Sequence, residues 1–509
     1  MRKLVIASSV LVDPHFRIMY DEAESQFLNG HDVTIASCDG VCGACIANPH
    51  AGRVQCRVCK YLSRWYERRF RERIKVVHYP RVARMSRKFE YSSASTLKQI
   101  VYRGVNVGYA VCSEYTTLTR DLLEDLTEDK RKYVDFLLNE ACHYVDVAVK
   151  LYDDIRPEAV SVFNGRFFET RPFYELAKLR KIPVRINEVA TVSPSPDEME
   201  FRHFVVQNCL PHDVDGFASK IRECWRLPNR SEDEKCKIAT EFFEARRKGR
   251  PSATSDLPGF DGVFTRKQVL GRLPENFDPK KHNIVIFNSS EDELSSIDRE
   301  FESHALYRVQ IDGIKAVARM LKDRPDYHVY LRVHPNLIPI KQPYHLMLYK
   351  LSEEFDNITV IPADSPCSTY DLIDVAEKVV VLGSTAGVEA TYRRKPVILI
   401  GSALYYRLDV AYKPRTEDEF RTLLLTDDLP PKSFDDALEY GYYIKQRADL
   451  ATKGRIIDLR VVRRKVYGKY RWMPTWPNNP ILNFALYSPL TEVIRSVINC
   501  LARNLLPHH

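Results

Sequence analysis

Apolar residues along the chain alternate between short unbroken runs and longer stretches in which they recur every three or four positions. In the second half the short runs fall at 283–287, 328–333, 358–361, 378–382 and 397–400. Their length and β-branched content predict buried strands, and the stretches between them predict helices, one of them over 304–323. This alternation is typical of a parallel sheet with helices on both faces.

The first half begins in the same way. An apolar run at 4–7, an amphipathic stretch at 17–28 and a second run at 33–36 predict a strand–helix–strand unit. A polar segment rich in Gly, Pro and Ser at 248–261 predicts a linker. We therefore expect an N-terminal domain over 1–265, a second α/β domain over 275–430, and a C-terminal extension.

Length and charge narrow the function without identifying it. A chain of 509 residues is too long for one compact core. Its net charge of +8 suits anionic ligands, but the basic residues do not form the dense stripe of a nucleic-acid binder. We find no unbroken apolar run long enough to span a bilayer, and the apolar start lacks a small-residue cleavage site. We expect a cytoplasmic protein.

Five cysteines fall within 22 residues, in a loop over 38–59. They are Cys38, Cys42, Cys45, Cys56 and Cys59. Two Cys-x-x-Cys pairs at short range are typical of a Cys₄ site for structural zinc or an iron–sulfur cluster, and Cys38 is an alternative ligand to Cys42. The spacing of the first three also occurs in radical S-adenosylmethionine enzymes, but the repeated βα barrel of that class is not evident.

Three polar segments follow predicted strands of the second domain, where open α/β sheets bind ligands. The first is Asn288-Ser289-Ser290, the second Arg332-Val333-His334-Pro335, and the third Gly383-Ser384-Thr385-Ala386-Gly387-Val388-Glu389. Backbone N–H groups and hydroxyls at such a turn suit phosphate oxygens, and Arg332 or His334 is a candidate to neutralise a diphosphate. Taken singly, each segment is equally compatible with a capped turn or a packing residue.

The order of these segments, together with Asp364-Ser365, Tyr370 and Arg394-Lys395-Pro396-Val397-Ile398, resembles bacterial capsule and surface-polysaccharide glycosyltransferases of the GT-B fold. More distantly it is similar to Kdo (3-deoxy-manno-octulosonate) transferases, CDP-glycerol glycerophosphotransferases and some sialyltransferases. The resemblance is strongest over about 283–401 and extends more loosely to the N-terminal half. It implies two Rossmann-like domains facing a cleft, here with the Cys-rich loop as an insertion and a helical C-terminal extension.

The resemblance also implies roles for particular residues. The nucleotide-sugar donor is expected at Ser289, Ser290, Arg332, His334, Ser384, Thr385, Gly387 and Glu389. The polysaccharide or lipid-linked saccharide acceptor is expected at Asn164, Arg166 and Arg171, with Glu188 or His212 as the base that deprotonates its hydroxyl. His334 is also a candidate to stabilise the leaving group.

The extension over 431–509 has two parts. Residues 435–452 predict a crossover helix that returns to the N-terminal domain. Basic residues interleaved with Tyr and Trp, followed by an amphipathic helix at about 490–506, make 457–509 a candidate for contact with a membrane surface. We therefore expect a peripheral location at the inner face of the cell membrane.

Other functions fit some of the same features. A glycerophosphate or phosphopolyol transferase would use similar phosphate-binding segments, and a sugar-nucleotide epimerase shares related motifs. A metal-bearing nucleic-acid-binding protein would instead use the basic stretch around Arg64–Arg73. The donor base, the sugar, the acceptor and the stereochemical outcome stay open at this stage.

Overall fold

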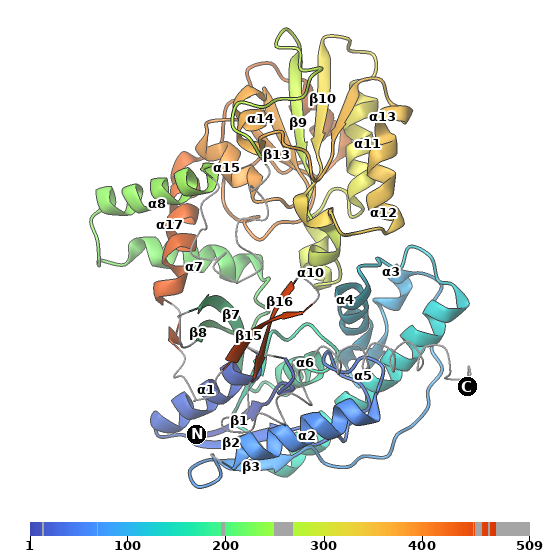
Figure 1. Ribbon diagram of the computed structural model, residues 1–509, viewed down its shortest axis with the longest axis vertical. Helices are drawn as coiled ribbons and strands as arrows, with labels where there is room; N and C mark the ends of the chain where they lie inside the picture. The colour runs from blue at the N-terminus through green and yellow to red at the C-terminus, as the bar shows by residue number, and fades with distance from the viewer. Residues whose placement is uncertain are drawn as a thin grey trace.

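The computed structural model describes residues 1–12, 15–68, 70–194, 199–248, 268–450, 452–453, 461–466 and 469–474. The chain forms two α/β domains, one above the other in Figure 1, with helices α7, α8 and α17 beside the junction. Each domain is built on a mainly parallel sheet. The prediction of an α/β fold with parallel sheets is therefore confirmed.

The N-terminal sheet has the order β14-β8-β7-β6-β1-β2-β3. Its strands are β1 (Arg2–Ile6), β2 (Asp32–Ser37), β3 (Lys75–His78), β6 (Ala159–Phe163), β7 (Val184–Pro194), β8 (Met199–Gln207) and β14 (Thr452–Lys453). The first five are parallel, and β8 and β14 extend the edge in antiparallel pairing. Strand β1 is buried from Lys3 to Ile6, as expected of a central strand with helices on both faces.

The C-terminal sheet is wholly parallel, with the order β11-β10-β9-β12-β13. Its strands are β9 (His282–Phe287), β10 (Tyr327–Arg332), β11 (Ile358–Ile361), β12 (Lys378–Val381) and β13 (Val397–Leu399). Both sheets thus reverse direction of winding once, between β1 and β6 in the first and between β9 and β12 in the second. Such reversal points are where open α/β sheets take their ligands, at the carboxyl ends of the strands.

Helices cover both sheets. In the N-terminal domain they are α1 (His15–Leu28), α2 (Arg53–Glu67), α3 (Ala94–Leu97), α4 (Val107–Thr119), α5 (Glu128–Ile155), α6 (Arg171–Leu179), α7 (Val214–Arg226) and α8 (Glu232–Arg247). In the C-terminal domain they are α9 (Glu291–Leu294), α10 (Arg299–Ser303), α11 (Gln310–Met320), α12 (Pro343–Leu346), α13 (Leu351–Glu354), α14 (Thr369–Val375), α15 (Ala386–Tyr392) and α16 (Glu417–Leu425). Short elements complete the set: β4 (Val101–Tyr102), β5 (Val105–Asn106), η1 (Pro335–Leu337) and η2 (Met347–Lys350).

The helix predicted over 304–323 is present as α11 but is shorter: it begins at Gln310, and α10 ends just before the predicted range. The backbone N–H of Tyr307 donates to the carbonyl of Ile400, 3.0 Å away, at the end of the neighbouring strand β13. Because this N–H is bonded to the residue that follows β13, it cannot form the hydrogen bond that would continue a helix between α10 and α11.

Helix α17 (Phe434–Leu450) is the expected crossover helix. Its aromatic residues pack on α7 and α8, with Tyr442 edge-on to Trp225 and Tyr443 edge-on to Phe217. Beyond it the extension is not wholly helical, because β15 (Val461–Val466) and β16 (Lys469–Pro474) form an antiparallel hairpin. The helix expected at 490–506 and most of the linker expected at 248–261 lie outside the described residues.

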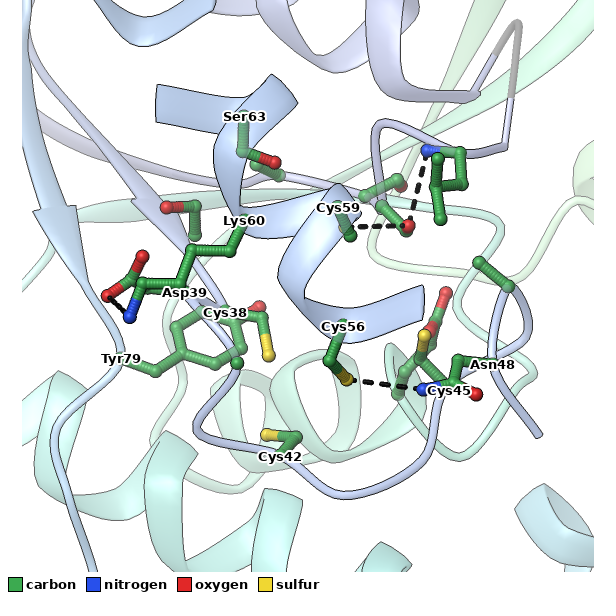
Figure 2. Close-up of a pocket in the computed structure, with 18 of the residues that line it drawn as sticks. Cys38, Asp39, Cys42, Cys45, Asn48, Cys56, Cys59, Lys60, Ser63 and Tyr79 are labelled. Atoms are coloured by element: carbon green, nitrogen blue, oxygen red, sulfur yellow. Dashed lines mark hydrogen bonds and ion pairs between the residues drawn. The ribbon is translucent and has the colours of Figure 1, made fainter. Parts of the chain in front are cut away.

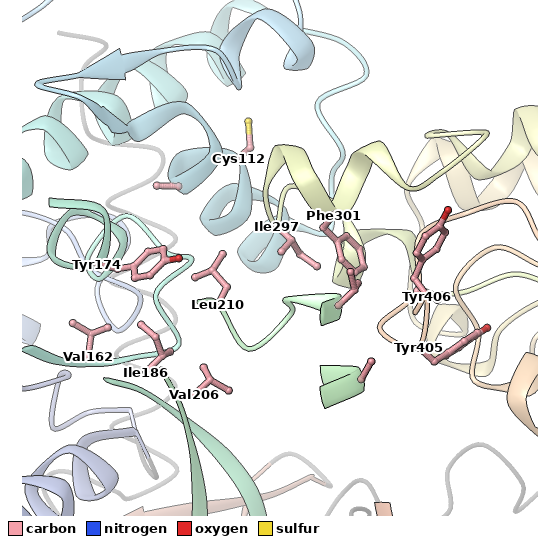
Figure 3. Packing of buried hydrophobic residues seen from close by; sticks show 14 of the residues in the cluster. Cys112, Val162, Tyr174, Ile186, Val206, Leu210, Ile297, Phe301, Tyr405 and Tyr406 are labelled. Carbon is pink, nitrogen blue, oxygen red and sulfur yellow. The ribbon is translucent and has the colours of Figure 1, made fainter. Parts of the chain in front are cut away.

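The two domains share one hydrophobic core cluster. Figure 3 shows Ile297 and Phe301 of the C-terminal domain between Leu210 and Tyr174 on one side and Tyr405 and Tyr406 on the other. A carboxylate of the C-terminal domain also bonds to the N-terminal domain: Glu302 accepts hydrogen bonds from Lys98 Nζ at 2.6 Å and from the Tyr109 hydroxyl at 3.0 Å. The interface therefore fixes the two sheet edges relative to each other.

Candidate functional site at the facing sheet edges

The reversal point of the C-terminal sheet brings two of the predicted donor segments together. Ser289 follows β9 and Gly383 follows β12. The Ser289 hydroxyl donates to the carbonyl of Leu382 at 3.2 Å and accepts from Gln310 Nε2 at 2.8 Å. Segments nearly a hundred residues apart are thus fixed side by side, with Ser289 used as the link between them.

The turn after β12 requires its glycines. Gly383 has φ +118°, and a Cβ there would lie 2.6 Å from the backbone oxygen of Ser402. A Cβ on Gly387 would lie 2.7 Å from the Tyr405 hydroxyl, which donates to the carbonyl of Ser384 at 2.6 Å. Ser384 is half-buried and Thr385 exposed. The result is a rigid turn that presents two hydroxyl residues at the sheet edge.

His334 lies at the carboxyl end of β10. Its backbone N–H donates to Asn288 Oδ1 at 2.8 Å, and its Nδ1 accepts the backbone N–H of Asn336 at 3.2 Å. An Nδ1 that accepts leaves the ring proton on Nε2. Burial and the charge of Arg332 lower the pKa of His334 to about 4. The imidazole is therefore a neutral N–H donor at pH 7, and it supplies no positive charge to a diphosphate.

Arg332 is directed into the protein. Its guanidinium donates to the backbone carbonyls of Pro362 and Ser365, and burial lowers its pKa to about 10. These bonds hold the 362–365 loop against β10. In this arrangement Arg332 shapes the sheet edge on which His334 sits.

Glu389 and Ser290 face other protein groups. Glu389 is buried and pairs with Arg246 of α8 at 3.0 Å. Ser290 donates to Asp292 Oδ1 at 2.7 Å, and the other oxygen of Asp292 accepts from Arg120 of the N-terminal domain. Both positions thus belong to links between the C-terminal edge and elements of the first half of the chain.

The predicted base lies beside the carboxyl end of β6. Glu188 was expected after a strand but stands within β7, one residue beyond the last pair that β7 forms with β6. Asn164 and Gly165 both have positive φ, at 57° and 81°, which turns the chain sharply after β6. Asn164 Nδ2 donates to Glu188 Oε2 at 2.6 Å, and the backbone N–H of Val189 donates to Oε1 at 2.9 Å. The carboxylate of Glu188 is thereby held in one orientation.

Glu188 and His212 line one cavity of about 180 Å³. Phe217 and Lys220 of α7 line it as well, and Leu404 and Tyr443 close it from the C-terminal part of the chain. Burial and the charge of Arg166 lower the pKa of His212 to about 3, so its imidazole is neutral at pH 7. The structure thus brings the two predicted base candidates to the same interdomain cavity.

Arg166 and Arg171, expected at the acceptor, both reach across the interface. Arg166 donates to Ser113 Oγ at 3.1 Å and to the carbonyl of Glu293 at 3.2 Å. Arg171 donates to the carbonyl of Ile297 at 2.8 Å. The bonds of both guanidinium groups thus serve contact between the domains, and the structure gives neither residue the acceptor role expected from the sequence.

Sequence reasoning did not single out Lys220 or Tyr443. Lys220 could have been found from the sequence. Asp213 caps α7 by accepting the backbone N–H of Gly216, and the helical register from that cap places Lys220 near His212. Tyr443 could not have been found in this way, because its position in the cavity depends on how α17 packs across the junction between the domains.

The five clustered cysteines line a second cavity. It lies where β1 and β2 end, and Tyr79, after β3, and Glu169, after β6, also line it. In Figure 2 the sulfurs of Cys38, Cys42 and Cys56 lie around one space, with Cys45 across from Cys38. Among the described residues, no group of three or more His, Cys, Asp or Glu side chains is arranged to hold a single metal ion. The predicted zinc site is therefore not supported by the geometry.

Three arginines of the basic stretch lie beside carboxylates of the same domain. Arg64 pairs with Asp39 at 2.9 Å, and Arg73 lies 3.5 Å from Glu24. Arg71 lies 3.6 Å from Glu67. In the part of the chain that the structure describes, no helix has the length and apolar content needed to cross a membrane.

Comparison with known families finds a match to the C-terminal domain. Residues 273–428 match the family described as "Capsule polysaccharide biosynthesis protein". The matched segment contains the whole C-terminal sheet and the segments at its edge. The resemblance to capsule biosynthesis proteins is thus confirmed over these residues. Among curated proteins, none matches the chain.

The solved structures that match the chain share little sequence with it. The β-Kdo 2,4-transferase of KpsC from Thermosulfurimonas dismutans is 13% identical, with 56% of this chain and 79% of that chain covered and a TM-score of 0.34. The β-Kdo 2,7-transferase of the same KpsC is 14% identical, with 70% and 89% covered and a TM-score of 0.32. A UDP-GlcNAc 2-epimerase from Neisseria meningitidis is 10% identical, with 88% and 98% covered and a TM-score of 0.27.

Proposed function

We propose that the chain is a glycosyltransferase of capsule or surface-polysaccharide biosynthesis, which moves a sugar from a nucleotide donor to a hydroxyl of a saccharide acceptor. One observation carries the proposal. The segment that matches the capsule biosynthesis family contains the C-terminal sheet, and at its reversal point Ser289 fixes the turn that carries Ser384 and Thr385, while His334 ends the adjacent strand β10.

The donor's phosphates fit this edge by hydrogen bonding. The turn at 383–385 offers a half-buried and an exposed hydroxyl residue at the end of β12. His334 adds a neutral N–H, since its lowered pKa keeps the ring uncharged at pH 7. Fixed donors of this kind stabilise the negative charge that develops on a departing nucleotide, because they need no reorganisation during the reaction.

The acceptor's hydroxyl belongs at the cavity on the opposite edge. Glu188 is the better base of the two candidates, because its carboxylate is held by Asn164 while the lowered pKa of His212 makes that imidazole a poor proton acceptor. In the transfer, the acceptor oxygen bonds to the anomeric carbon as the bond from that carbon to the donor phosphate breaks. The acceptor proton passes to Glu188, and the nucleotide leaves with the bonding electron pair.

The test begins with a thermal-shift screen against CMP, CDP, UDP, GDP and TDP. The nucleotide that stabilises the protein then identifies donors for a transfer assay, with CDP-glycerol included to detect a phosphopolyol transferase. We expect His334→Ala to weaken nucleotide binding about tenfold, the effect of losing one hydrogen bond.

His328→Ala is the matched control, since His328 lies near the other end of strand β10 and bonds to Thr359. It should leave nucleotide binding unchanged. The proposal fails if no nucleotide stabilises the protein, or if transfer from every donor tested is the same in His334→Ala as in the unaltered chain.

A further inference from the structure

The cysteine cavity lies apart from the reaction proposed above and has the features of a cofactor site. Its five thiols come from two elements, the loop after β2 and the first turns of α2. Cys56 and Cys59 are three residues apart on that helix and so lie on one face. The loop and the helix both direct thiols into one cavity. This arrangement comes from the tertiary fold, since closeness in sequence alone does not place side chains of a loop and a helix in the same space.

The loop that carries three of these thiols is fixed by buried polar residues. Glu140 of α5 is buried and accepts the backbone N–H of Gly43 at 2.9 Å and of Ala44 at 3.2 Å. A Cβ on Gly43 would lie 2.8 Å from Glu140 Oε1, so a glycine is required there. The Tyr144 hydroxyl donates to the carbonyl of Ala44 at 3.0 Å.

The other end of the loop is fixed in the same way. Asn48 is buried and accepts the backbone N–H of Gly52 at 2.8 Å, while its amide donates to the carbonyl of Gly52 at 3.0 Å. The same amide lies 3.2 Å from Cys56 Sγ. Glu169 accepts the backbone N–H of Ile46 at 3.2 Å. Buried second-layer groups that orient a set of thiols are what metal sites require, and reduced cysteines in a plain loop do not need them.

The size of the space distinguishes a cluster from a single ion. A tetrahedral Cys₄ zinc site draws its sulfurs to within roughly 3.8 Å of one another, given a Zn–S distance of about 2.3 Å. Among the described side chains no group of three or more potential ligands is arranged around one ion. The thiols instead surround a cavity of about 60 Å³, several times the roughly 10–15 Å³ that one water needs. A polynuclear group with sulfide between its irons fits such a space.

We propose that this cavity holds a [4Fe–4S] cluster bound by Cys38, Cys42, Cys45 and Cys56. Cysteine thiolates are the usual ligands of such clusters, and four are needed. The four thiols lose their protons when the cluster binds. Cys59 is left as a neighbour, since its sulfur lies 3.3 Å from the Ser9 hydroxyl on the side of β1. Asn48 supplies an N–H to the Cys56 sulfur, a contact of the kind that adjusts cluster potential.

The experiment uses the full chain, expressed with added iron and purified without oxygen. We expect about four irons and four acid-labile sulfides per chain, a brown colour with broad visible absorption, and an electron paramagnetic resonance signal after reduction with dithionite. These measurements do not depend on transfer activity, so they succeed or fail independently of the proposed function.

Serine variants test the ligand assignment. Cys42→Ser, Cys45→Ser and Cys56→Ser should each lose most of the iron and sulfide. Cys59→Ser and Cys236→Ser should keep both, the latter because Cys236 lies on α8 and outside the cavity. Circular dichroism identifies any variant that fails to fold, and the metal content of the unaltered chain decides the proposal without variants. One zinc per chain without sulfide, no metal at all, or cluster loss in Cys59→Ser with retention in Cys56→Ser would each overturn it.

Discussion

The five parallel strands of each sheet follow the same order, but the carboxyl edges of the two sheets carry different chemistry. The C-terminal edge presents glycines, hydroxyls and a neutral imidazole, and much of its polar surface is committed to hydrogen bonds with the rest of the protein. The N-terminal edge presents the carboxylate of Glu188 and a cavity lined by thiols. The same scaffold thus holds a rigid surface for binding on one side and titratable groups on the other.

The largest effect should come from the N-terminal edge. Glu188→Gln keeps the size of the side chain and its contact with Asn164 but removes the proton acceptor. We expect kcat for transfer to fall by about 10²–10⁴-fold, with nucleotide binding unchanged. Steady-state kinetics with a nucleotide titration measures both quantities. A fall in nucleotide affinity with kcat preserved would reverse the roles assigned to the two edges.

The next effect concerns the buried pair behind the C-terminal edge. Arg246→Met leaves the buried carboxylate of Glu389 without its partner, 3.0 Å away. We expect the free energy of unfolding to fall by about 2–4 kcal/mol, because an uncompensated buried charge is costly. Arg247→Met is the matched control, since its pair with Asp374 is more exposed and should contribute about 1 kcal/mol or less. Urea denaturation of both variants checks this, and equal losses would contradict it.

The turn after β12 should show a smaller loss of stability combined with a loss of binding. Gly383→Ala places a Cβ 2.6 Å from the Ser402 oxygen at a φ of +118°. We expect about 1–3 kcal/mol of destabilisation and weaker nucleotide binding, because the turn must shift to relieve the strain. Gly271→Ala is the control: it also has positive φ, but no atom lies within 4 Å of its added Cβ. If Gly383→Ala binds nucleotide normally, the turn does not contact the donor.

The smallest effect is a pH dependence at the N-terminal edge. The folded pKa of His212 is lowered to about 3, well below its ordinary value of 6.5. The unfolded chain therefore binds the proton first as pH falls below 6.5, and folding stability is lost progressively below that pH. Relative to His212→Gln, the unaltered chain should lose about 1 kcal/mol between pH 7 and about pH 5.5. A stability difference that is constant across this range would show that His212 does not titrate in this way.

The sequence predicted those elements whose pattern of apolar and polar residues is contained within the element itself. Apolar runs such as 378–382 located the five strands of the C-terminal sheet, and the order of polar segments after them led to the resemblance to capsule biosynthesis proteins. The split between α10 and α11 could not be predicted, because it depends on the bond from Tyr307 to Ile400 in another strand.

Side-chain roles were harder to predict than positions. His334 was expected as a possible cation, but burial and the nearby Arg332 lower its pKa, and neither cause is visible in a strand-end motif. Arg166 and Glu389 were placed at the correct edges, yet their partners, Glu293 and Arg246, lie more than a hundred residues away. Residue type and spacing identify an edge, whereas the partner of each group is set by how the domains meet.

The return of α17 to α7 and α8 has a practical consequence for dividing the protein. A fragment ending before residue 434 would leave Phe217 and Trp225 without the tyrosines that cover them. A fragment beginning at residue 268 would carry the same tyrosines uncovered. Each half would then expose an aromatic surface suited to aggregation. Expression of the separate halves should therefore keep residues 434–450 with the N-terminal part, for example through a circularly permuted chain.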